Sequence, residues 1–468
     1  MRSLKTYRTY LLLFLWVICS VAAIGQSDST ILSHKQYLRN IILFHPLAKK
    51  ANLQTKIGQA QWLAAKGYLD PSLSSSWNEK NFDEKLYYRY YGGELRVPTA
   101  LGLDIVGGYE NTEGEFLNDE SRTDRFGLWH LGIELNLLQG LYINERRTAL
   151  KQAEVFQSLS ENQRQLLLND LLYDASTAYL TWQMYFYFDS VLKENIVIAA
   201  AYLENTVTAF ELGDKTGMDT LEASIMRRDA VNLLRKNEVD YIKAKQNAEN
   251  FMWLDDVPVN LFDTTKPEAY DNDLFQIRIA ADQNTLIDNH PLILSYKNKQ
   301  ANLAIAQQLK REKLKPKLKA KYNPLLSTPN GDLTPYYTAN NYKLGLEFSM
   351  PILFRQERAE IQRGKIRLKE VGYVIQHKRN ELNNKLEGSV LTQVVINEQI
   401  VLSEQNVDGY LRLMEGESEK FNFGESSVFL LNKRQDKYIS GRLKLIELHI
   451  KLQIEQLNYA YLSNDLNE

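Results

Sequence analysis

Two histidines that each precede a proline are the residues in this sequence most suggestive of chemistry. They are His45, followed by Pro46, and His290, followed by Pro291. A histidine pair can bind a metal ion, but neither histidine has a further ligand at helical spacing. Histidine followed by proline also fits a helix start, because proline is tolerated at the first helical position. We therefore favour two helix caps over a metal site.

Catalytic and cofactor motifs are not recognisable in the sequence. No glycine-rich phosphate loop follows a strand-like segment, no cysteines and histidines cluster, and no HExxH zinc motif occurs. The six histidines are scattered along the chain. We expect no enzyme activity, no cofactor and no bound metal ion.

The only cysteine, Cys19, lies in a segment typical of a secretory signal. Residues 1–25 contain a basic start, a short apolar stretch and small residues just before Gln26. The apolar stretch is short for a membrane anchor, which is the alternative. Lipidation at Cys19 is disfavoured by the bulky Ile18 before it. Cleavage at Gln26 would leave a mature chain without cysteine and therefore without disulfides.

Charge and apolarity exclude two further classes. The formal net charge is −2, and this balance does not suggest a nucleic-acid partner, which usually requires a basic surface. The stretch closest to a transmembrane helix is 166–192, but acidic and amide residues interrupt it. A buried helix is the better interpretation.

The predicted helices and strands form two repeats, and the order of elements is the same in each. The first repeat, 26–254, is expected to contain a helix at 45–67, strands at 72–137, a long helix at 142–212 and a return helix at 218–253. A polar linker at 255–285 follows. The second repeat, 286–468, is expected to contain a helix at 290–314, strands at 317–350, and helices at 356–422 and 428–464.

The strand segments alternate apolar residues with polar residues or glycine. Leu131 and Ile133, for example, flank Gly132 and precede Glu134. A soluble sandwich can show this pattern, and so can a membrane β-barrel. We favour the barrel, because the strands follow a secretory signal and are rich in Tyr and Trp. Three lysines on the polar face indicate either anionic cargo or a solvated wall: Lys317, Lys319 and Lys321.

The first half contains additional strand-like residues. The stretch between Pro71 and Gly132 is about twice as long as the equivalent stretch between Pro316 and Gly345. We therefore expect an extra hairpin near 86–110, giving four strands in the first half and two in the second. This hairpin either widens the barrel or folds outside it.

The longest helical segments each end at a glycine. Residues 142–212 contain no proline and would reach about 105 Å as one helix. Such a helix must pack in a coiled coil to be stable in water. Gly213 and Gly424 stand at the turns, where a positive φ is needed.

Two tip sequences and their order resemble a known family. They are Phe210–Thr216 and Phe421–Ser427, each an aromatic residue, a glycine three positions on, and a threonine or serine three positions after that. Together with the strand-to-helix junction at 346–353, they resemble the TolC-type outer-membrane efflux proteins, the outer membrane factors. The resemblance covers about residues 31–465.

The resemblance implies a mixed α and β membrane protein that forms a trimeric channel-tunnel. The family's usual barrel has twelve strands from three identical chains, whereas the six strands expected in each chain here would give about eighteen if all join the wall. The barrel would cross the outer membrane, in contact with its lipid, and α-helical coiled-coil hairpins would cross the periplasm. A periplasmic adaptor would dock on the tips and link the duct to an inner-membrane pump. The corresponding docking residues here are Gly213, Thr216, Gly424 and Ser427. The function implied is the exit duct of a tripartite efflux or type I secretion system, with cargo chosen by the pump.

The family closes its tunnel with charged residues just past the turns, and here the two halves differ. Asp219 and Glu222 follow the first turn, whereas Leu430 and Lys433 occupy the matching positions after the second. Tripled by symmetry, the acids would form rings that favour cations. A Lys433–Glu222 contact, a hydrophobic constriction, or simple solvation of all four residues are the alternatives.

Two other functions fit parts of the sequence. A periplasmic coiled-coil scaffold or adaptor would need no barrel, and the alternating aromatic strands argue against it. A general porin would explain only the strands, since porins lack such long helices.

Overall fold

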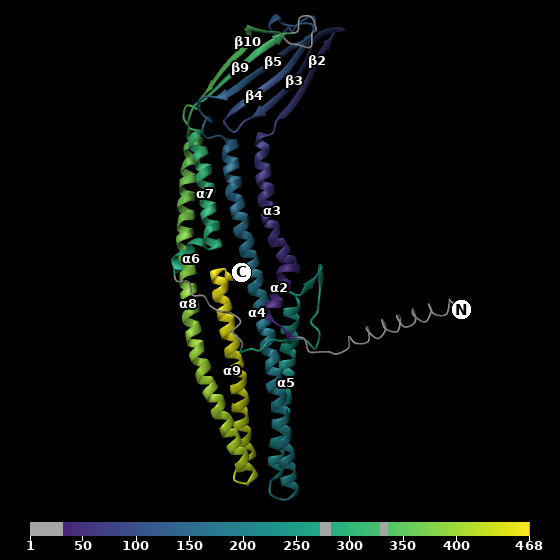
Figure 1. Ribbon diagram of the computed structural model, residues 1–468, viewed down its shortest axis with the longest axis vertical. Helices are drawn as coiled ribbons and strands as arrows, with labels where there is room; N and C mark the ends of the chain where they lie inside the picture. Colours follow the sequence, from purple (N-terminus) through teal and green to yellow (C-terminus); the bar gives the residue numbers. More distant parts are fainter. Residues whose placement is uncertain (1–30, 272–281, 328–335, 468) are drawn as a thin grey trace, which may run out of the picture. The chain divides into compact units, whose positions relative to one another are not determined.

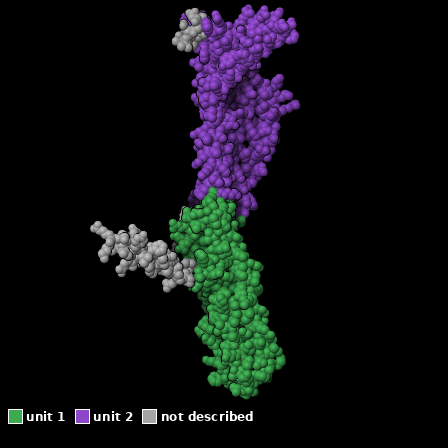
Figure 2. Space-filling model, turned by 90° about the vertical axis from the view of Figure 1, so that its right-hand side faces the viewer, with its two compact units in different colours: residues 1–49, 167–280, 384–468 green, residues 50–166, 281–383 purple. Residues whose placement is uncertain are grey.

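The computed structural model describes residues 31–271, 282–327 and 336–467 (Figure 1). The expected signal at 1–25, Cys19 and part of the expected linker at 255–285 lie outside the described residues. The chain divides into two compact units (Figure 2). Unit 1 comprises residues 1–49, 167–280 and 384–468, and unit 2 comprises residues 50–166 and 281–383.

Unit 2 contains one antiparallel sheet of six strands, in the order β10-β9-β5-β4-β3-β2 (Figure 1). Four strands come from the first half of the chain and two from the second. They are β2 (Ser72–Phe82), β3 (Lys85–Pro98), β4 (Leu103–Glu113), β5 (Leu128–Asn136), β9 (Lys317–Ser327) and β10 (Tyr336–Ser349). A two-residue turn joins β2 to β3, and its residues Asp83 and Glu84 have φ of 57° and 58°. Positive φ at both positions is the type I′ geometry that suits the twist of a hairpin.

Long helices follow the strands and run into unit 1. The helix α4 (Glu145–Glu211) has 67 residues and α8 (Arg355–Asn422) has 68. Two return helices belong to unit 1, α5 (Gly217–Glu249) and α9 (Val428–Ser463). One shorter helix precedes the strands in each half, α3 (Pro46–Lys66) in the first and α7 (Pro291–Glu312) in the second.

Aromatic side chains form the core of unit 1. Tyr37, Tyr179 and Trp182 are all fully buried. The Tyr37 hydroxyl donates to the Ala248 carbonyl oxygen at 2.9 Å, and the Tyr179 hydroxyl donates to the Leu32 carbonyl oxygen at 2.7 Å. Each hydroxyl thus gains a partner at the end of its buried ring, which avoids the cost of an unpaired polar group.

Two helices and several short strands occur where the sequence did not lead us to expect them. The helix α2 (His34–Phe44) directly precedes α3, and α6 (Gln283–Asn289) directly precedes α7. Ser33 caps α2 and Asp282 caps α6. Short strands pair as β1 (Ile31–Leu32) with β8 (Lys266–Pro267) and β6 (Trp253–Leu254) with β7 (Val257–Pro258).

The helix caps expected at His45 and His290 are confirmed. The Leu292 N–H donates to His290 Nδ1 at 3.1 Å, and the Leu47 N–H donates to His45 Nδ1 at 3.2 Å. Each histidine also ends the preceding helix, with an extended ψ of 133° at His45 and 132° at His290. The following proline imposes this break, because its ring disfavours helical ψ in the residue before it.

Replacement of His290 by asparagine should make stability less sensitive to acid. Burial lowers the pKa of His290 from 6.5 to about 4. As pH falls from about 6.5 towards about 4, the unfolded chain gains a proton that the folded chain resists, so stability falls. Asparagine also caps helices but does not titrate in this range. Thermal unfolding of His290→Asn followed by circular dichroism should therefore decline less steeply over that pH range.

The control is His377→Asn, which removes an exposed histidine. It should leave the pH dependence of stability unchanged. An equally steep decline in His290→Asn and the unaltered protein would show that this cap does not resist protonation.

Candidate functional site: an inverted sheet and two helical tips

The sheet in unit 2 exposes its apolar face, and on β5 its polar face buries the Glu134 side chain. On β5 the side chains of Leu131 and Ile133 are 57% and 45% exposed, whereas Glu134 is 5% exposed. The apolar face continues on β10 with Leu344, Leu346 and Phe348, which are at least 61% exposed. A water-soluble sheet places these faces the other way round, because burying apolar surface stabilises it.

An aromatic row crosses four adjacent strands on the exposed face. Its members are Trp77 on β2, Tyr91 on β3, Tyr109 on β4 and Trp129 on β5. Successive ring centroids lie 6.4, 6.1 and 4.9 Å apart. Beyond the row on the same face, Arg89 forms ion pairs with Glu79 at 2.8 Å and Glu113 at 2.9 Å. Aromatic rings followed by charges are the order found where a membrane meets water.

The opposite, polar face is organised around Glu134. Its Oε2 lies 2.7 Å from Arg96 Nη1 and 2.6 Å from Lys319 Nζ, and its Oε1 lies 3.5 Å from Lys321 Nζ. Arg96 also pairs with Glu94 at 2.9 Å. The network therefore connects β3, β5 and β9 through one carboxylate.

These ion pairs change the interpretation of the lysines on the polar face. Lys319 and Lys321 both lie within 3.5 Å of the Glu134 carboxylate, so their charge is partly offset and is less available for an anionic cargo. Of the three, only Lys317 lacks an ion pair among the described residues. The sequence shows the lysines but not the register that places Glu134 opposite Lys321.

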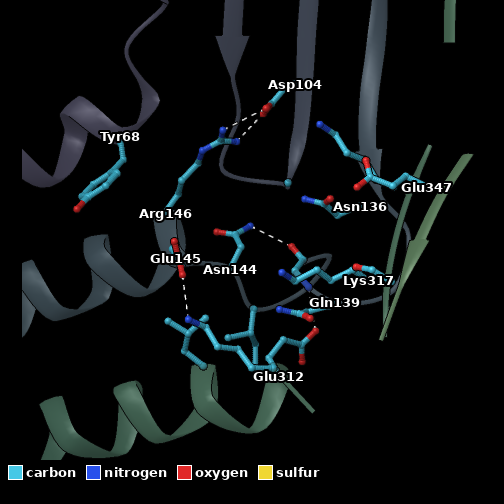
Figure 3. Close-up of a pocket in the computed structure, with 17 residues that line it drawn as sticks. Tyr68, Asp104, Asn136, Gln139, Asn144, Glu145, Arg146, Glu312, Lys317 and Glu347 are labelled. Atoms are coloured by element: carbon cyan, nitrogen blue, oxygen red, sulfur yellow. Dashed lines mark hydrogen bonds and ion pairs between the residues drawn. The ribbon is translucent and has the colours of Figure 1, made fainter. Parts of the chain in front are cut away.

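A cavity of about 430 Å³ lies where the strands meet the first turn of α4 and the last turn of α7 (Figure 3). Two ion pairs and one backbone hydrogen bond join residues of its lining. Arg146 lies 2.5 Å from Asp104, Lys313 lies 3.1 Å from Glu145, and the Gly140 N–H donates to Glu312 at 3.2 Å. The cavity is thus a polar joint that fixes α4 and α7 to the sheet.

The two helical tips have the same hydrogen-bonding geometry. At the first tip, the Gly213 N–H donates to the Phe210 carbonyl and the Asp214 N–H to the Ala209 carbonyl, at 3.0 and 2.8 Å. Gly424 and Glu425 make the equivalent bonds at 3.1 and 2.8 Å. This is the Schellman arrangement that ends a helix with a positive φ, here 86° at Gly213 and 78° at Gly424. A Cβ added at either glycine would meet no atom within 4 Å, so only the φ angle requires glycine.

Three residues after each glycine, a hydroxyl caps the return helix. The Thr216 hydroxyl accepts from the Asp219 N–H at 3.3 Å, and the Ser427 hydroxyl accepts from the Leu430 N–H at 3.3 Å. These two predicted docking residues thus have a defined structural role at the N-termini of α5 and α9.

The predicted gate residues have different surroundings. The Asp219 carboxylate accepts hydrogen bonds from the Thr216 N–H at 2.9 Å and hydroxyl at 2.7 Å. These bonds lower the pKa of Asp219. Glu222 is half-buried and Lys433 is exposed. Within the described part of one chain, no ion pair joins Glu222 to Lys433.

A contact between the tips involves a residue that the sequence did not single out. Lys215 Nζ lies 4.5 Å from the centre of the Phe421 ring and donates to the Ser426 carbonyl oxygen at 3.3 Å. The only sequence signal for this contact was that Lys215 lies inside the first tip motif and Phe421 begins the second. Large apolar side chains also lie exposed around both tips: Leu212, Met218, Phe423 and Phe429.

Neither a metal centre nor a membrane-spanning helix is found among the described residues. No group of three or more His, Cys, Asp or Glu side chains there is arranged to hold a metal ion. Among the described helices, none combines the length and the apolarity needed to cross a bilayer.

The fold is shared with solved outer-membrane channels. The chain is 12% identical to the outer-membrane channel CmeC of Campylobacter jejuni, covering 92% of this chain and 85% of that one, with a TM-score of 0.66. The chain is 11% identical to the open outer-membrane channel MtrE of Neisseria gonorrhoeae, with a TM-score of 0.66. The match covers 94% of this chain and 93% of that one. The chain is 11% identical to CusC, described as forming a transmembrane channel, with a TM-score of 0.69. The match covers 92% of this chain and 91% of that one. No protein-family model and no curated protein matches the sequence.

Removal of the carboxylate at the centre of the charged face should destabilise the sheet. In Glu134→Gln, Arg96 and Lys319 would lose the anion that separates their charges. We expect a loss of about 1 kcal/mol in the free energy of unfolding, because the partner cations Arg96 and Lys319 are themselves about a third exposed. The shift of the guanidinium unfolding midpoint measures it.

Glu347→Gln is the matched control. Glu347 lies opposite Lys319 in the register of β9 and β10 but forms no ion pair among the described residues. The control makes the same change of charge on the same face and should leave the midpoint nearly unchanged. Equal midpoints for the two variants would contradict the central role of Glu134.

Proposed function

We propose that this chain, which has the fold of the TolC-type outer-membrane channels, is the exit duct of a tripartite efflux or type I secretion system. The duct conducts cargo passively across the periplasm and the outer membrane. An inner-membrane pump supplies the energy, and a periplasmic adaptor connects the pump to the tips. This function requires transport through a passage and no bond-making chemistry in the chain itself.

The observation that carries the proposal is the inverted sheet. Its exposed apolar face and aromatic row match a surface that contacts lipid, and its charged face matches a water-filled lumen. A periplasmic scaffold without a barrel would expose Leu131 and its neighbours to water at a cost in free energy. The sheet therefore favours the channel over the scaffold.

The unpaired edges of the sheet support assembly from several identical chains. One edge is β2 and the other is β10. In a membrane, unpaired backbone groups at a sheet edge are too costly, so the sheet must close into a barrel. We propose that three copies close it, in line with the trimer of the family that the sequence resembles.

The helices are proposed to cross the periplasm. At 67 residues, α4 extends about 100 Å. The equivalent histidine caps and glycine turns in both halves support an origin by internal duplication. Three chains with two helical hairpins each would then give a tunnel of six similar units.

The tips are proposed to dock the adaptor. Gly213 and Gly424 provide tight turns with open space around them, and Thr216 and Ser427 fix the return helices. The exposed side chains of Leu212 and Phe423, at 74% and 81%, offer apolar surface to a partner. Such surface is a common feature of protein interaction sites.

We propose that the acids near the first tip give the periplasmic entrance a preference for cations. Asp219 caps α5 and also carries its charge at the tip, and Glu222 lies one turn further along the same helix. Glu222 and Lys433 do not pair within the described part of one chain, so the proposed preference rests on the acids alone.

The lipid-facing surface can be tested by introducing a charge. Arginine at a lipid-facing position near the membrane centre costs about 2–4 kcal/mol. Leu131→Arg should therefore reduce the amount of trimer in the outer-membrane fraction. If the protein were a soluble periplasmic scaffold, the change would be tolerated, since Leu131 is already 57% exposed.

Leu254→Arg is the control, because Leu254 is 53% exposed but lies outside the six-stranded sheet. It should leave the outer-membrane trimer unchanged. Recovery of both variants as soluble periplasmic protein, together with the unaltered chain, would refute the proposed function.

The entrance can be tested with variants that separate charge from capping. Asp219→Asn keeps an oxygen that accepts from Thr216, whereas Asp219→Ala removes both the charge and the cap. Both should lower the preference for cations in planar bilayers, and only the alanine variant should also lose about 1 kcal/mol of stability. Glu222→Gln should lower the cation preference as well.

Glu211→Gln removes an exposed carboxylate before the turn and serves as the control. It should leave the ion preference nearly unchanged. An unaltered preference in both Asp219→Asn and Glu222→Gln would exclude an acidic entrance.

A further inference from the structure

We infer that the hairpin β2–β3 is part of the barrel wall, so that three copies of the six-stranded sheet close a barrel of eighteen strands. The family that the sequence resembles is expected to have twelve. The inference rests on the proposed function, since it assumes that the sheet forms a membrane channel. It goes further by assigning this chain a wider pore and hence larger cargo at the outer membrane.

The first support is continuous pairing. β2 pairs with β3 from Ser72 opposite Arg96 to Phe82 opposite Lys85, with one irregularity near Lys80. β3 then pairs with β4 from Arg89 opposite Glu113 to Pro98 opposite Asp104. A hairpin folded inside the barrel as a plug, or outside as a decoration, would not continue the ladder in this way.

The second support is that the hairpin has the same two faces as the rest of the sheet. Trp77 and Tyr91 extend the aromatic row to the edge of the sheet. Leu73 and Leu95 extend the exposed apolar face at 80% and 47% exposure. The residues that alternate with them on β2 include the small polar Ser74. The hairpin is therefore built to contact lipid on one side and water on the other.

The third support is the match between the two free edges. Each strand in the sheet is antiparallel to its neighbours, so the first and last of six strands run in opposite directions. The β2 strand of one copy can thus pair with the β10 strand of the next without interrupting the antiparallel order. The two edges have comparable lengths, 11 residues in β2 and 14 in β10. A repeated head-to-tail contact of this kind closes into a ring.

The number of strands determines the width of the pore. With strands about 4.8 Å apart and tilted by about 40°, twelve strands give a backbone diameter of about 24 Å and eighteen give about 36 Å. The cross-sectional area then roughly doubles. We assign to this duct cargo too bulky for a twelve-stranded barrel.

The topology also allows the hairpin β2–β3 to be deleted without reversing any other strand. β2 starts and β3 ends at the same end of the sheet, next to the start of β4. Deletion of residues 72–97 therefore leaves α3 leading into β4 and preserves the direction of every remaining strand. The four strands that remain in each chain correspond to a barrel of twelve.

The first experiment locates the contact between copies with cysteine pairs in the full chain. A cysteine at Ser74 on β2 is combined in turn with a cysteine at Lys343, Gly345 or Glu347 on β10, which covers different registers on the same face. We expect disulfide-linked trimers from at least one of these pairs. The competing series combines Val106→Cys on β4 with the same three positions. Links from β4 and none from β2 would place the hairpin outside the wall and overturn the inference.

The second experiment measures the barrel by electron cryomicroscopy of the full chain and of the deletion variant. We expect about 36 Å for the full chain and about 24 Å for the variant. A full-chain barrel of about 24 Å would overturn the wider pore but leave the proposed function intact. A full chain that forms no barrel in the membrane would overturn both. If the deletion variant does not fold, the diameter of the full chain and the cysteine pairs still decide the question.

Discussion

Under the proposed channel function, the structure depends on one constraint, which is that every backbone polar group of the sheet must find a partner where water is absent. The sheet already presents its apolar side chains outwards, as a surface in lipid does. Its interior strands satisfy their N–H and carbonyl groups within the chain, whereas β2 and β10 each leave one edge unpaired. The proposed membrane location would therefore require an oligomer, because only pairing between chains could satisfy these two edges. The charged opposite face fits the same proposal, since a face turned away from lipid would be in water, and Glu134 there offsets part of the charge of Arg96 and Lys319.

The spacing of apolar residues and the positions of proline and glycine account for the parts of the fold that are locally determined. The two-residue alternation around Leu131 marks β5, and the absence of proline from 142 to 212 matches the extent of α4 at Glu145–Glu211. Histidine followed by proline marks the starts of α3 and α7, because the cap and the fixed φ of proline act within one turn. The glycine turns are local for the same reason, as φ is positive there whatever surrounds them. The shared fold with solved outer-membrane channels confirms the resemblance drawn from these features.

Features that depend on distant contacts could not be predicted from the sequence. The helices α2 and α6 are short, and short helices need tertiary packing to be stable. Tyr37 on α2, for instance, is held by the Ala248 carbonyl more than 200 residues away. The pairing of Lys319 and Lys321 with Glu134 depends on which strands are neighbours and in which register. The capping role of Asp219 is different, because threonine followed three residues later by an acid is a local signal that was present in the sequence.

The difference between the two tips is explained by helix capping before any gating is considered. Thr216 and Asp219 form a reciprocal box in which each satisfies a backbone N–H of the other. The second tip has Ser427 as the cap but Leu430 at the matching third position, so only half of this arrangement is present. An acid at the N-terminus of a helix is favoured by the helix dipole as well, whatever lies across the pore. The charge of Asp219 at the tip is therefore a consequence of stabilising α5. Glu222 takes no part in this cap, so it is the better candidate for the acidic entrance proposed above.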